Sequence, residues 1–75
     1  MNNWNALFTG TILGNTYSLR VSRTDTVWNA EMYVAAPGGE VIHSFTRDFD
    51  SRWMGFQSIQ SVKSAMLREA REDLA

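Results

Sequence analysis

Residues 17–22 read Tyr-Ser-Leu-Arg-Val-Ser, a strict alternation of apolar and polar side chains. Successive side chains of an extended strand point to opposite faces, so this pattern is typical of a strand with one buried and one exposed face. Tyr17, Leu19 and Val21 are predicted to face the core. We therefore expect a strand over about residues 16–23.

The segment before this strand has the composition of a second strand. Residues 6–13 are rich in Thr, Phe, Ile and Leu, and Gly14-Asn15 follows them. This pair tolerates the positive φ that a tight hairpin turn needs. The sequence thus predicts that the first two strands pair in antiparallel fashion.

A further alternation covers about residues 27–36. It places Trp28, Ala30, Met32 and Val34 on a predicted core face, and Val27, Asn29, Glu31 and Tyr33 on the other face. The turn residues Pro37-Gly38-Gly39 then precede a fourth strand, expected over about residues 40–46. For this strand the pattern leaves two choices, because either the odd-numbered or the even-numbered residues could face the core.

After Arg47 the period changes from two toward 3.6, which predicts a C-terminal amphipathic helix over about residues 58–74. Asp50 or Ser51 could cap a first short turn, and Gly55 followed by Ser58 offers a break and a second cap. We expect the main helix to start near Ser58. Its apolar stripe consists of Ile59, Val62, Met66, Ala70 and Leu74.

These elements predict one α+β domain spanning residues 1–75, a four-stranded antiparallel meander with the helix packed on one face. A domain of this size has a stability margin of roughly 3–5 kcal/mol unless something reinforces it. The chain has no Cys and therefore no disulfide. Dense packing of its nine aromatic residues or association with another chain could supply the reinforcement.

The composition also limits the classes of partner. Seven basic and eight acidic residues give a net charge of −1, whereas a phosphate-binding protein needs a strongly basic face, so no direct nucleic-acid binding is expected. No apolar run approaches the roughly 20 residues of a membrane span, and residues 1–5 do not resemble a secretory signal. We expect a soluble protein of the cytoplasm that does not bind membranes.

Few residues could support catalysis or metal binding. His43 could act as a base beside Ser44 or an acidic residue, but we interpret it as a partly buried histidine of an edge strand. Asp48 and Asp50 could form a carboxylate pair, but we interpret Asp50 as a helix cap and Asp48 as a solvated loop charge. We expect no enzyme activity, no metal and no cofactor.

Four residues are candidates for binding a partner. Arg20, Glu31 and Tyr33 are predicted to share the polar face of the sheet, and Arg and Tyr are enriched in recognition surfaces. Trp53 lies between the last strand and the helix, near Phe56. Both aromatic residues could either anchor a partner or close the core.

The chain bears two resemblances to known families. Trp28-Asn29-Ala30-Glu31, followed by Phe45 to Asp50 before a helix, resembles AP2-type DNA-binding domains and the arm-binding domains of integrases, which read DNA with a basic sheet. The second and third strands depart from that pattern because they carry few basic residues.

The second resemblance covers about residues 15–72. The run Arg47-Asp48-Phe49-Asp50-Ser51, then Trp53, a glycine break and the helix segment from Ala65-Met66 to Arg71, is similar to small phage anti-CRISPR inhibitors of type I-F effector complexes. The resemblance implies a non-enzymatic inhibitor that binds a Cas subunit and blocks target recognition. It also implies contacts through Glu31 and Tyr33, while Arg20 stands where a further aromatic contact is expected.

Three functions therefore remain open at the level of sequence. The first is a phage or mobile-element protein that inhibits by binding a host protein complex, with anti-CRISPR as its specific form. The second is an AP2-like or integrase-arm-like regulator that binds nucleic acid. The third is a homo-oligomeric structural module, such as a homodimer, that uses its exposed aromatic residues for self-association.

Overall fold

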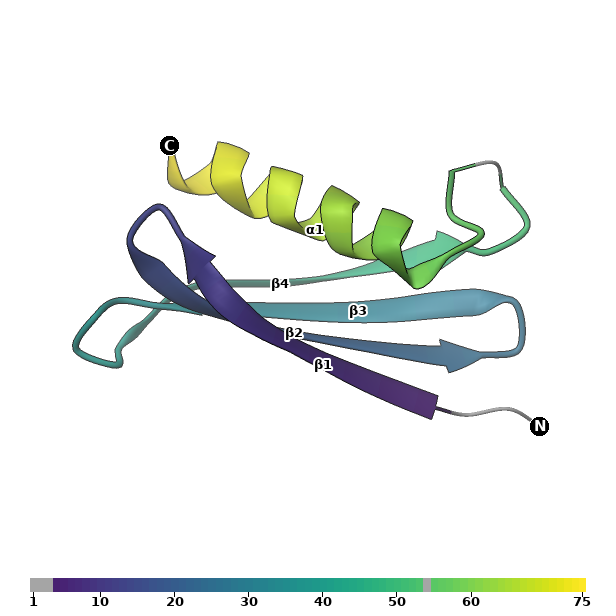
Figure 1. Ribbon diagram of the computed structural model, residues 1–75, viewed down its shortest axis with the longest axis horizontal. Coiled ribbons are helices and arrows are strands. Elements are labelled where there is room, and N and C mark those ends of the chain that lie inside the picture. Colours follow the sequence, from purple (N-terminus) through teal and green to yellow (C-terminus); the bar gives the residue numbers. More distant parts are fainter. Residues whose placement is uncertain (1–3, 54) are drawn as a thin grey trace.

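The computed structural model describes residues 4–53 and 55–75, and it confirms the predicted α+β class (Figure 1). Four strands pair in antiparallel fashion in the order β1-β2-β3-β4, and each strand neighbours the next one along the chain. The elements are β1 Trp4–Ile12, β2 Asn15–Thr24, β3 Val27–Ala35, β4 Val41–Asp50 and α1 Ile59–Leu74.

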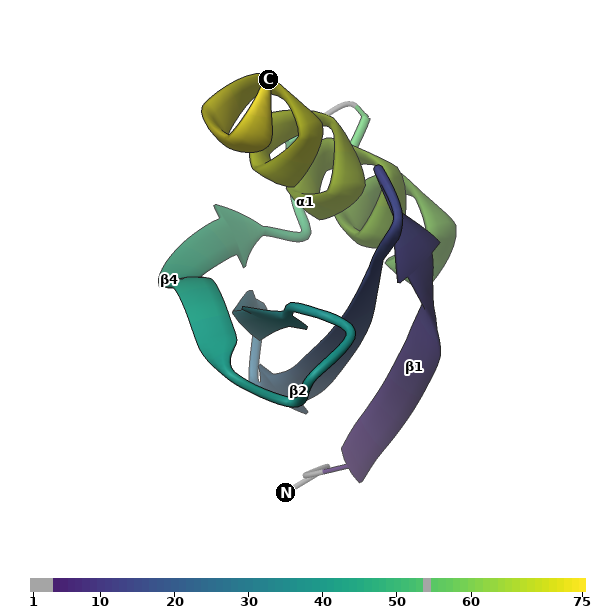
Figure 2. The ribbon, with the colours of Figure 1, turned by 90° about the vertical axis from the view of Figure 1, so that its left-hand side faces the viewer.

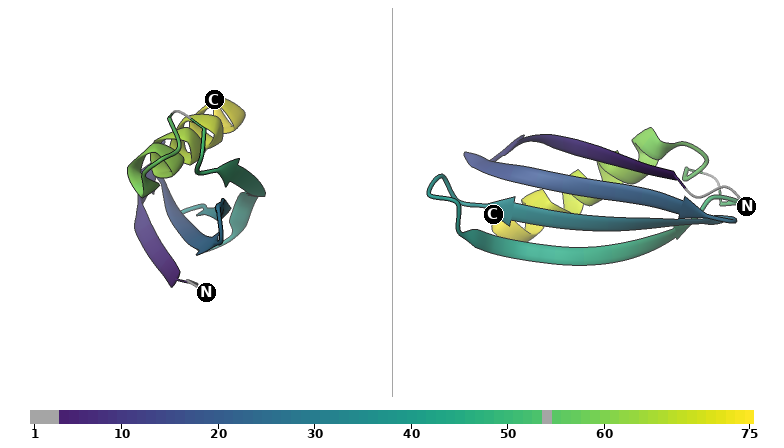
Figure 3. Two further views of the ribbon diagram at one scale, coloured as in Figure 1. Left: turned by 90° about the vertical axis from the view of Figure 1, so that its right-hand side faces the viewer. Right: turned by 90° about the horizontal axis from the view of Figure 1, so that it is seen from below.

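The sheet is strongly curved, and α1 lies along its concave side (Figure 2). The helix packs mainly over β2, β3 and β4. We call the concave side the helix-side face and the convex side the outer face. Seen from below in Figure 3, the strands lie in front of the helix, so α1 leaves the outer face uncovered.

The core forms between the helix-side face and α1. Alternate residues of the two central strands are buried there, as their sequence pattern predicts. Val62, Met66 and Ala70 of α1 are buried against them, while Ile59 and Leu74 pack at the margins. The buried strand residues are Ile12, Tyr17, Leu19, Val21, Trp28, Ala30, Met32 and Val34.

The first hairpin turn lies one residue earlier than predicted. Ile12 pairs with Asn15, so the two turn residues are Leu13 and Gly14 rather than Gly14 and Asn15. Both turn residues have positive φ, 49° and 80°, which is the signature of a type I′ turn. This turn matches the twist of the flanking strands, so the hairpin accepts a leucine in an unfavourable conformation.

The fourth strand is longer than predicted and continues to Asp50 instead of ending at Thr46. The sequence pattern left two choices for its buried face. The register of β4 against β3 shifts at a bulge, since Val34 pairs with His43 while Ala35 pairs with Val41. Val41 and Ile42 are both exposed there. Beyond the bulge, the odd-numbered residues pair with the buried residues of β3 and share the helix-side face.

Two predicted roles of aspartates are corrected by this extension. Asp48 is a strand residue, and its Oδ1 accepts a hydrogen bond from the Asn29 side chain at 2.8 Å. Asp50 does not cap the helix, because its Oδ1 accepts from the backbone N–H of Arg52 in a local turn. The helix cap is Ser58, as predicted.

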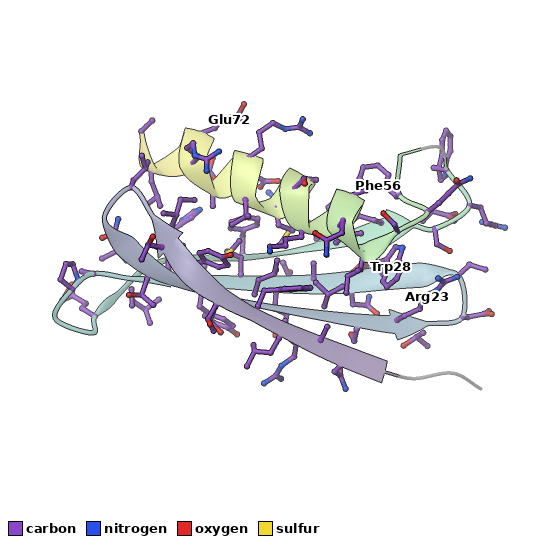
Figure 4. The ribbon with its side chains drawn as sticks, in the orientation of Figure 1. Arg23, Trp28, Phe56 and Glu72 are labelled. Atoms are coloured by element: carbon purple, nitrogen blue, oxygen red, sulfur yellow. The ribbon has the colours of Figure 1, made fainter. Side chains whose placement is uncertain are left out.

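The segment between β4 and α1 is fixed to the end of the sheet (Figure 4). The Trp28 indole N–H donates to the Phe56 carbonyl at 2.9 Å. Arg23 stacks on the Trp28 ring at 4.8 Å and donates to the Ser51 hydroxyl, and Ser51 is buried. Within the part of the chain described, no helix has the length and apolar character needed to cross a membrane.

Candidate functional site

The outer face is a broad surface of short polar side chains. Its positions alternate with the buried ones, so β2 and β3 present opposite faces of very different character. Most positions on this outer face hold a side chain with a hydroxyl or an amide group. These hydroxyl and amide residues are Asn5, Thr9, Thr11, Thr16, Ser18, Ser22, Thr24, Asn29, Ser44 and Thr46.

A charged pair lies near the middle of this surface. Arg20 of β2 and Glu31 of β3 are directly opposite each other in the strand register. Among the described residues, however, neither side chain forms a hydrogen bond or an ion pair shorter than 4 Å. Most other charges on the sheet are already engaged within the chain. The guanidinium and the carboxylate therefore keep their binding capacity for another molecule.

Two larger side chains flank the charged pair. Tyr33, two residues from Glu31 on β3, exposes 47% of its surface. Leu7 of β1 pairs with Arg20 and is 63% exposed. A solvent-exposed tyrosine can bury its ring and donate its hydroxyl proton, which is why tyrosine is enriched in protein interfaces. The structure thus brings three of the four predicted binding residues onto one uncovered face.

Trp53, the fourth predicted residue, lies apart from this group. It is 69% exposed and belongs to the segment that leaves β4 on the side of the sheet where α1 lies (Figure 1). Phe56 differs from it, because its ring packs 4.7 Å from that of Phe49 and is partly buried. Of the two aromatic residues, Phe56 closes the core and only Trp53 remains available to a partner.

The turn beside Trp53 has one strongly perturbed carboxyl group. The Arg52 guanidinium holds both oxygens of Asp50, and its Nη2 lies 2.7 Å from Oδ2. These hydrogen bonds stabilise the ionised form and lower the pKa of Asp50 to about 2. The same contact raises the pKa of Arg52. The pair fixes the local turn rather than leaving a charge free for a ligand.

His43 is partly buried on the edge strand β4, as predicted. Its Nε2 lies 3.0 Å from Oδ2 of Asp73 on α1. Ser44, the neighbour considered as a nucleophile, is on the opposite face of the sheet. The histidine therefore has a carboxylate partner but no adjacent hydroxyl nucleophile from Ser44, and the contact ties α1 to β4.

A groove of about 460 Å³ lies between α1 and β4, and the sequence pattern did not reveal it. Two of its charged residues pair with each other, since the Arg47 guanidinium holds the Glu69 carboxylate, and Asp73 pairs with His43 outside the lining. No Ser, Thr, Cys or His is among its described lining residues. Glu72 also borders the groove, and Figure 4 shows its side chain directed away from the sheet. The groove offers apolar contact and charge but no nucleophile.

In residues 4–53 and 55–75, no cluster of three or more His, Cys, Asp or Glu side chains is arranged to hold a metal ion.

The candidate site is the outer face around Arg20, Glu31 and Tyr33, where charged and aromatic groups without a partner among the described residues lie together. Comparison of the chain with protein-family models, with curated proteins and with solved structures gives no match.

Proposed function

We propose that this chain is a non-enzymatic binding protein that docks onto a larger host protein through its outer face. The observation that carries the proposal is the free Arg20 and Glu31 pair beside the exposed Tyr33. Tyrosine and arginine are the residue types that most often anchor protein interfaces. A protein partner with complementary charges can engage both signs at once.

The short hydroxyl side chains around this group also favour a protein partner. Ser and Thr lose little side-chain entropy when they are immobilised, and their hydroxyls both donate and accept hydrogen bonds. When such a surface binds a folded partner, its hydroxyls can exchange hydrogen bonds with water for hydrogen bonds with the partner. Recognition surfaces built from Tyr, Ser and Asn use the same combination.

The specific form that we propose is an inhibitor of a type I-F CRISPR effector complex, encoded by a phage or a mobile element. This form is supported by the resemblance over about residues 15–72, whose implied contact residues Glu31 and Tyr33 share the uncovered face. The inhibitor would occupy a Cas subunit and prevent the guide RNA from pairing with its target. Such a role needs surface complementarity and no catalytic group.

Nucleic-acid binding by this face is disfavoured by its charge. In the AP2-like alternative, a basic sheet would contact DNA, but Arg20 is the one basic residue on the outer face of the described strands. Glu31 and Asp48 on the same face repel phosphates. A titration with duplex and single-stranded DNA at moderate salt should show no more than non-specific binding. Sub-micromolar, salt-dependent affinity would instead favour the DNA-binding alternative.

The test of the proposed function is direct binding to a purified type I-F effector complex. Glu31→Ala combined with Tyr33→Ala should weaken binding by about 30-fold, which corresponds to roughly 2 kcal/mol for removal of an interface anchor. The matched control combines Arg71→Ala with Glu72→Ala on the exposed end of α1, and it should bind like the wild type.

A phage plaque assay then tests the biological form of the proposal. Wild type should restore plaque formation on a host with active CRISPR immunity, and the outer-face double variant should not. Absence of binding to the complex, together with undiminished immunity, would contradict the anti-CRISPR form. Binding that the control variant weakens as much as the outer-face variant would contradict the proposed surface.

A further inference from the structure

The two edges of the sheet differ in how they are protected. β1 and β4 are the edge strands, and each pairs with a neighbour on one side only. An unprotected edge is a template for another strand, so natural proteins usually guard it with charges, bulges or a covering element. β4 has all three kinds of protection, whereas β1 carries no charge and no bulge of its own, and the one described charge over it is the Lys63 ammonium of α1, 4.8 Å from the centre of the Phe8 ring on the helix-side face.

The protection of β4 comes from its own residues and from α1. It carries the bulge opposite Val34 and Ala35, and four ionisable side chains lie along it. Arg47 and His43 also bind carboxylates of the helix, Glu69 and Asp73. These ion pairs tie α1 to the edge strand β4.

β1 is regular, nine residues long and uncharged. No Asp, Glu, Lys, Arg or His occurs between Met1 and Leu19. The helix packs mainly over the other three strands, and Figure 2 shows β1 at one end of the curved sheet. None of the hydrogen bonds between described residues reaches the outer edge of this strand.

The hairpin turn decides which backbone groups β1 presents at this edge. In a two-residue type I′ turn, Ile12 and Asn15 form a hydrogen-bonded pair. Hydrogen-bonded and non-bonded pairs then alternate along the hairpin, so the even-numbered residues of β1 bond to β2. The N–H and C=O groups of the odd-numbered residues point outward. These residues are Asn5, Leu7, Thr9 and Thr11, all exposed.

We propose that this edge is a homodimerisation site at which β1 pairs in antiparallel fashion with β1 of a second copy, with Phe8 on the two-fold axis. In this register Leu7 faces Thr9 of the second copy, and Asn5 faces Thr11. All outward groups are then paired, which gives about eight hydrogen bonds between the copies. The two sheets become one continuous sheet with both helices on the same side.

A second copy suits this edge better than an unrelated strand because the edge is complementary to itself. A two-fold axis sets the same surface of both copies against each other, which a charged edge would oppose by repulsion. β1 itself has no charged residue and each whole chain carries only −1, while the Lys63 ammonium lies over Phe8 on the helix-side face rather than at the outward backbone groups. The inference does not rest on the proposed function, since it concerns the edge and leaves the outer face free.

The association is tested by analytical ultracentrifugation over the micromolar to millimolar range. Wild type should show a concentration-dependent dimer. Leu7→Pro removes one outward N–H while preserving the ladder to β2, because proline is tolerated where the N–H of an edge strand faces solvent. It should weaken the dimer by about tenfold or more. Wild type that is monomeric throughout the range would overturn the proposal.

A pair of lysine variants separates the two edges without proline. Thr9→Lys puts a charge beside the proposed axis, and Thr46→Lys puts the same charge on β4; both positions are exposed on the outer face. Only Thr9→Lys should weaken the dimer. Equal weakening by both variants, or a dimer weakened by Arg20→Ala and not by Thr9→Lys, would overturn the edge proposal in favour of pairing through the outer face.

The register can be read by disulfide trapping, because the chain contains no Cys. A mixture of Leu7→Cys and Thr9→Cys copies should form a mixed disulfide dimer under mild oxidation, since facing residues of a hydrogen-bonded pair lie about 5.5 Å apart between Cα atoms. Each variant alone should cross-link more slowly. Equal rates in all three samples would contradict the register with Phe8 on the axis.

Discussion

The helix-side face and the outer face of the sheet consist of alternate residues of the same four strands, yet their side chains have opposite tasks. On β2 and β3 the helix-side residues are almost fully buried under α1, and their neighbours in sequence face solvent. Burial of apolar area on the helix-side face stabilises the fold. The outer face buries little apolar area, so we expect it to contribute little to stability, and we propose it as the recognition surface. The following predictions separate the two.

The largest effect is expected at the centre of the helix-side interface. Val62→Asp places a carboxylate where the side chain is 0% exposed, and among the described residues no cation is buried with it. An unpaired buried charge costs about 3–5 kcal/mol, which is comparable to the whole stability of so small a domain. Circular dichroism should show a largely unfolded chain. Ser64→Asp, exposed on the same helix, is the control and should stay folded.

A medium effect is expected at the end of the core, where two tryptophans provide a matched pair. Trp28→Phe removes the hydrogen bond to the Phe56 carbonyl and leaves a small cavity, so it should cost about 2–3 kcal/mol in urea unfolding. Trp53→Phe changes an exposed ring and should stay within about 0.5 kcal/mol of wild type. An equal loss of unfolding free energy in both variants would show that the Trp53 ring is packed against the protein and not exposed to solvent.

The outer face should respond far less in the same assay. The combined Glu31→Ala and Tyr33→Ala variant removes one half-buried and one exposed side chain, neither of which bonds to a described residue, so its free energy of unfolding should change by about 1 kcal/mol at most. A loss as large as that of Trp28→Phe would mean that the outer face is structural. The comparison between the two faces would then fail.

The smallest effect concerns the turn beside Trp53 and depends on pH. Arg52 lowers the pKa of Asp50 from 3.8 to about 2, so their contact stabilises the fold fully above about pH 4. This stability is lost as the pH falls toward 2. Arg52→Ala should therefore be slightly less stable than wild type at pH 5, and the difference should shrink at pH 2. Urea unfolding at both values measures it, and a difference that grows in acid would contradict the assignment.

Much of the fold follows from local sequence pattern, because burial on one face leaves a period in the chain. The alternations around Leu19 and Met32 and the stripe through Met66 all lie where the structure has its core. The pattern failed at the end of β4. There Arg47 occupies a helix-side position, and its charge is accommodated by Glu69, 22 residues away in sequence. A pattern of neighbouring residues does not reveal a partner that is so distant in sequence.

The candidate site was predictable only in part for the same reason. Alternation alone places Arg20, Glu31 and Tyr33 on one face, since strand periodicity determines orientation. It could not place Trp53, whose position depends on how the connecting segment is anchored through Trp28 and the Phe56 carbonyl. The lack of charge on β1 is visible in the sequence, but the bulge of β4 and its contacts with α1 are not, because they depend on where α1 packs.

The order of the elements along the chain has a consequence during protein synthesis. Each strand pairs with the one made just before it through a short turn, and such local contacts form rapidly. The helix follows all four strands, so the ribosome produces the apolar concave surface before it produces the cover. In that interval Leu19 and Met32, fully buried at the end, are accessible to water and to other nascent chains. Chaperones would find their binding surface in this short-lived sheet.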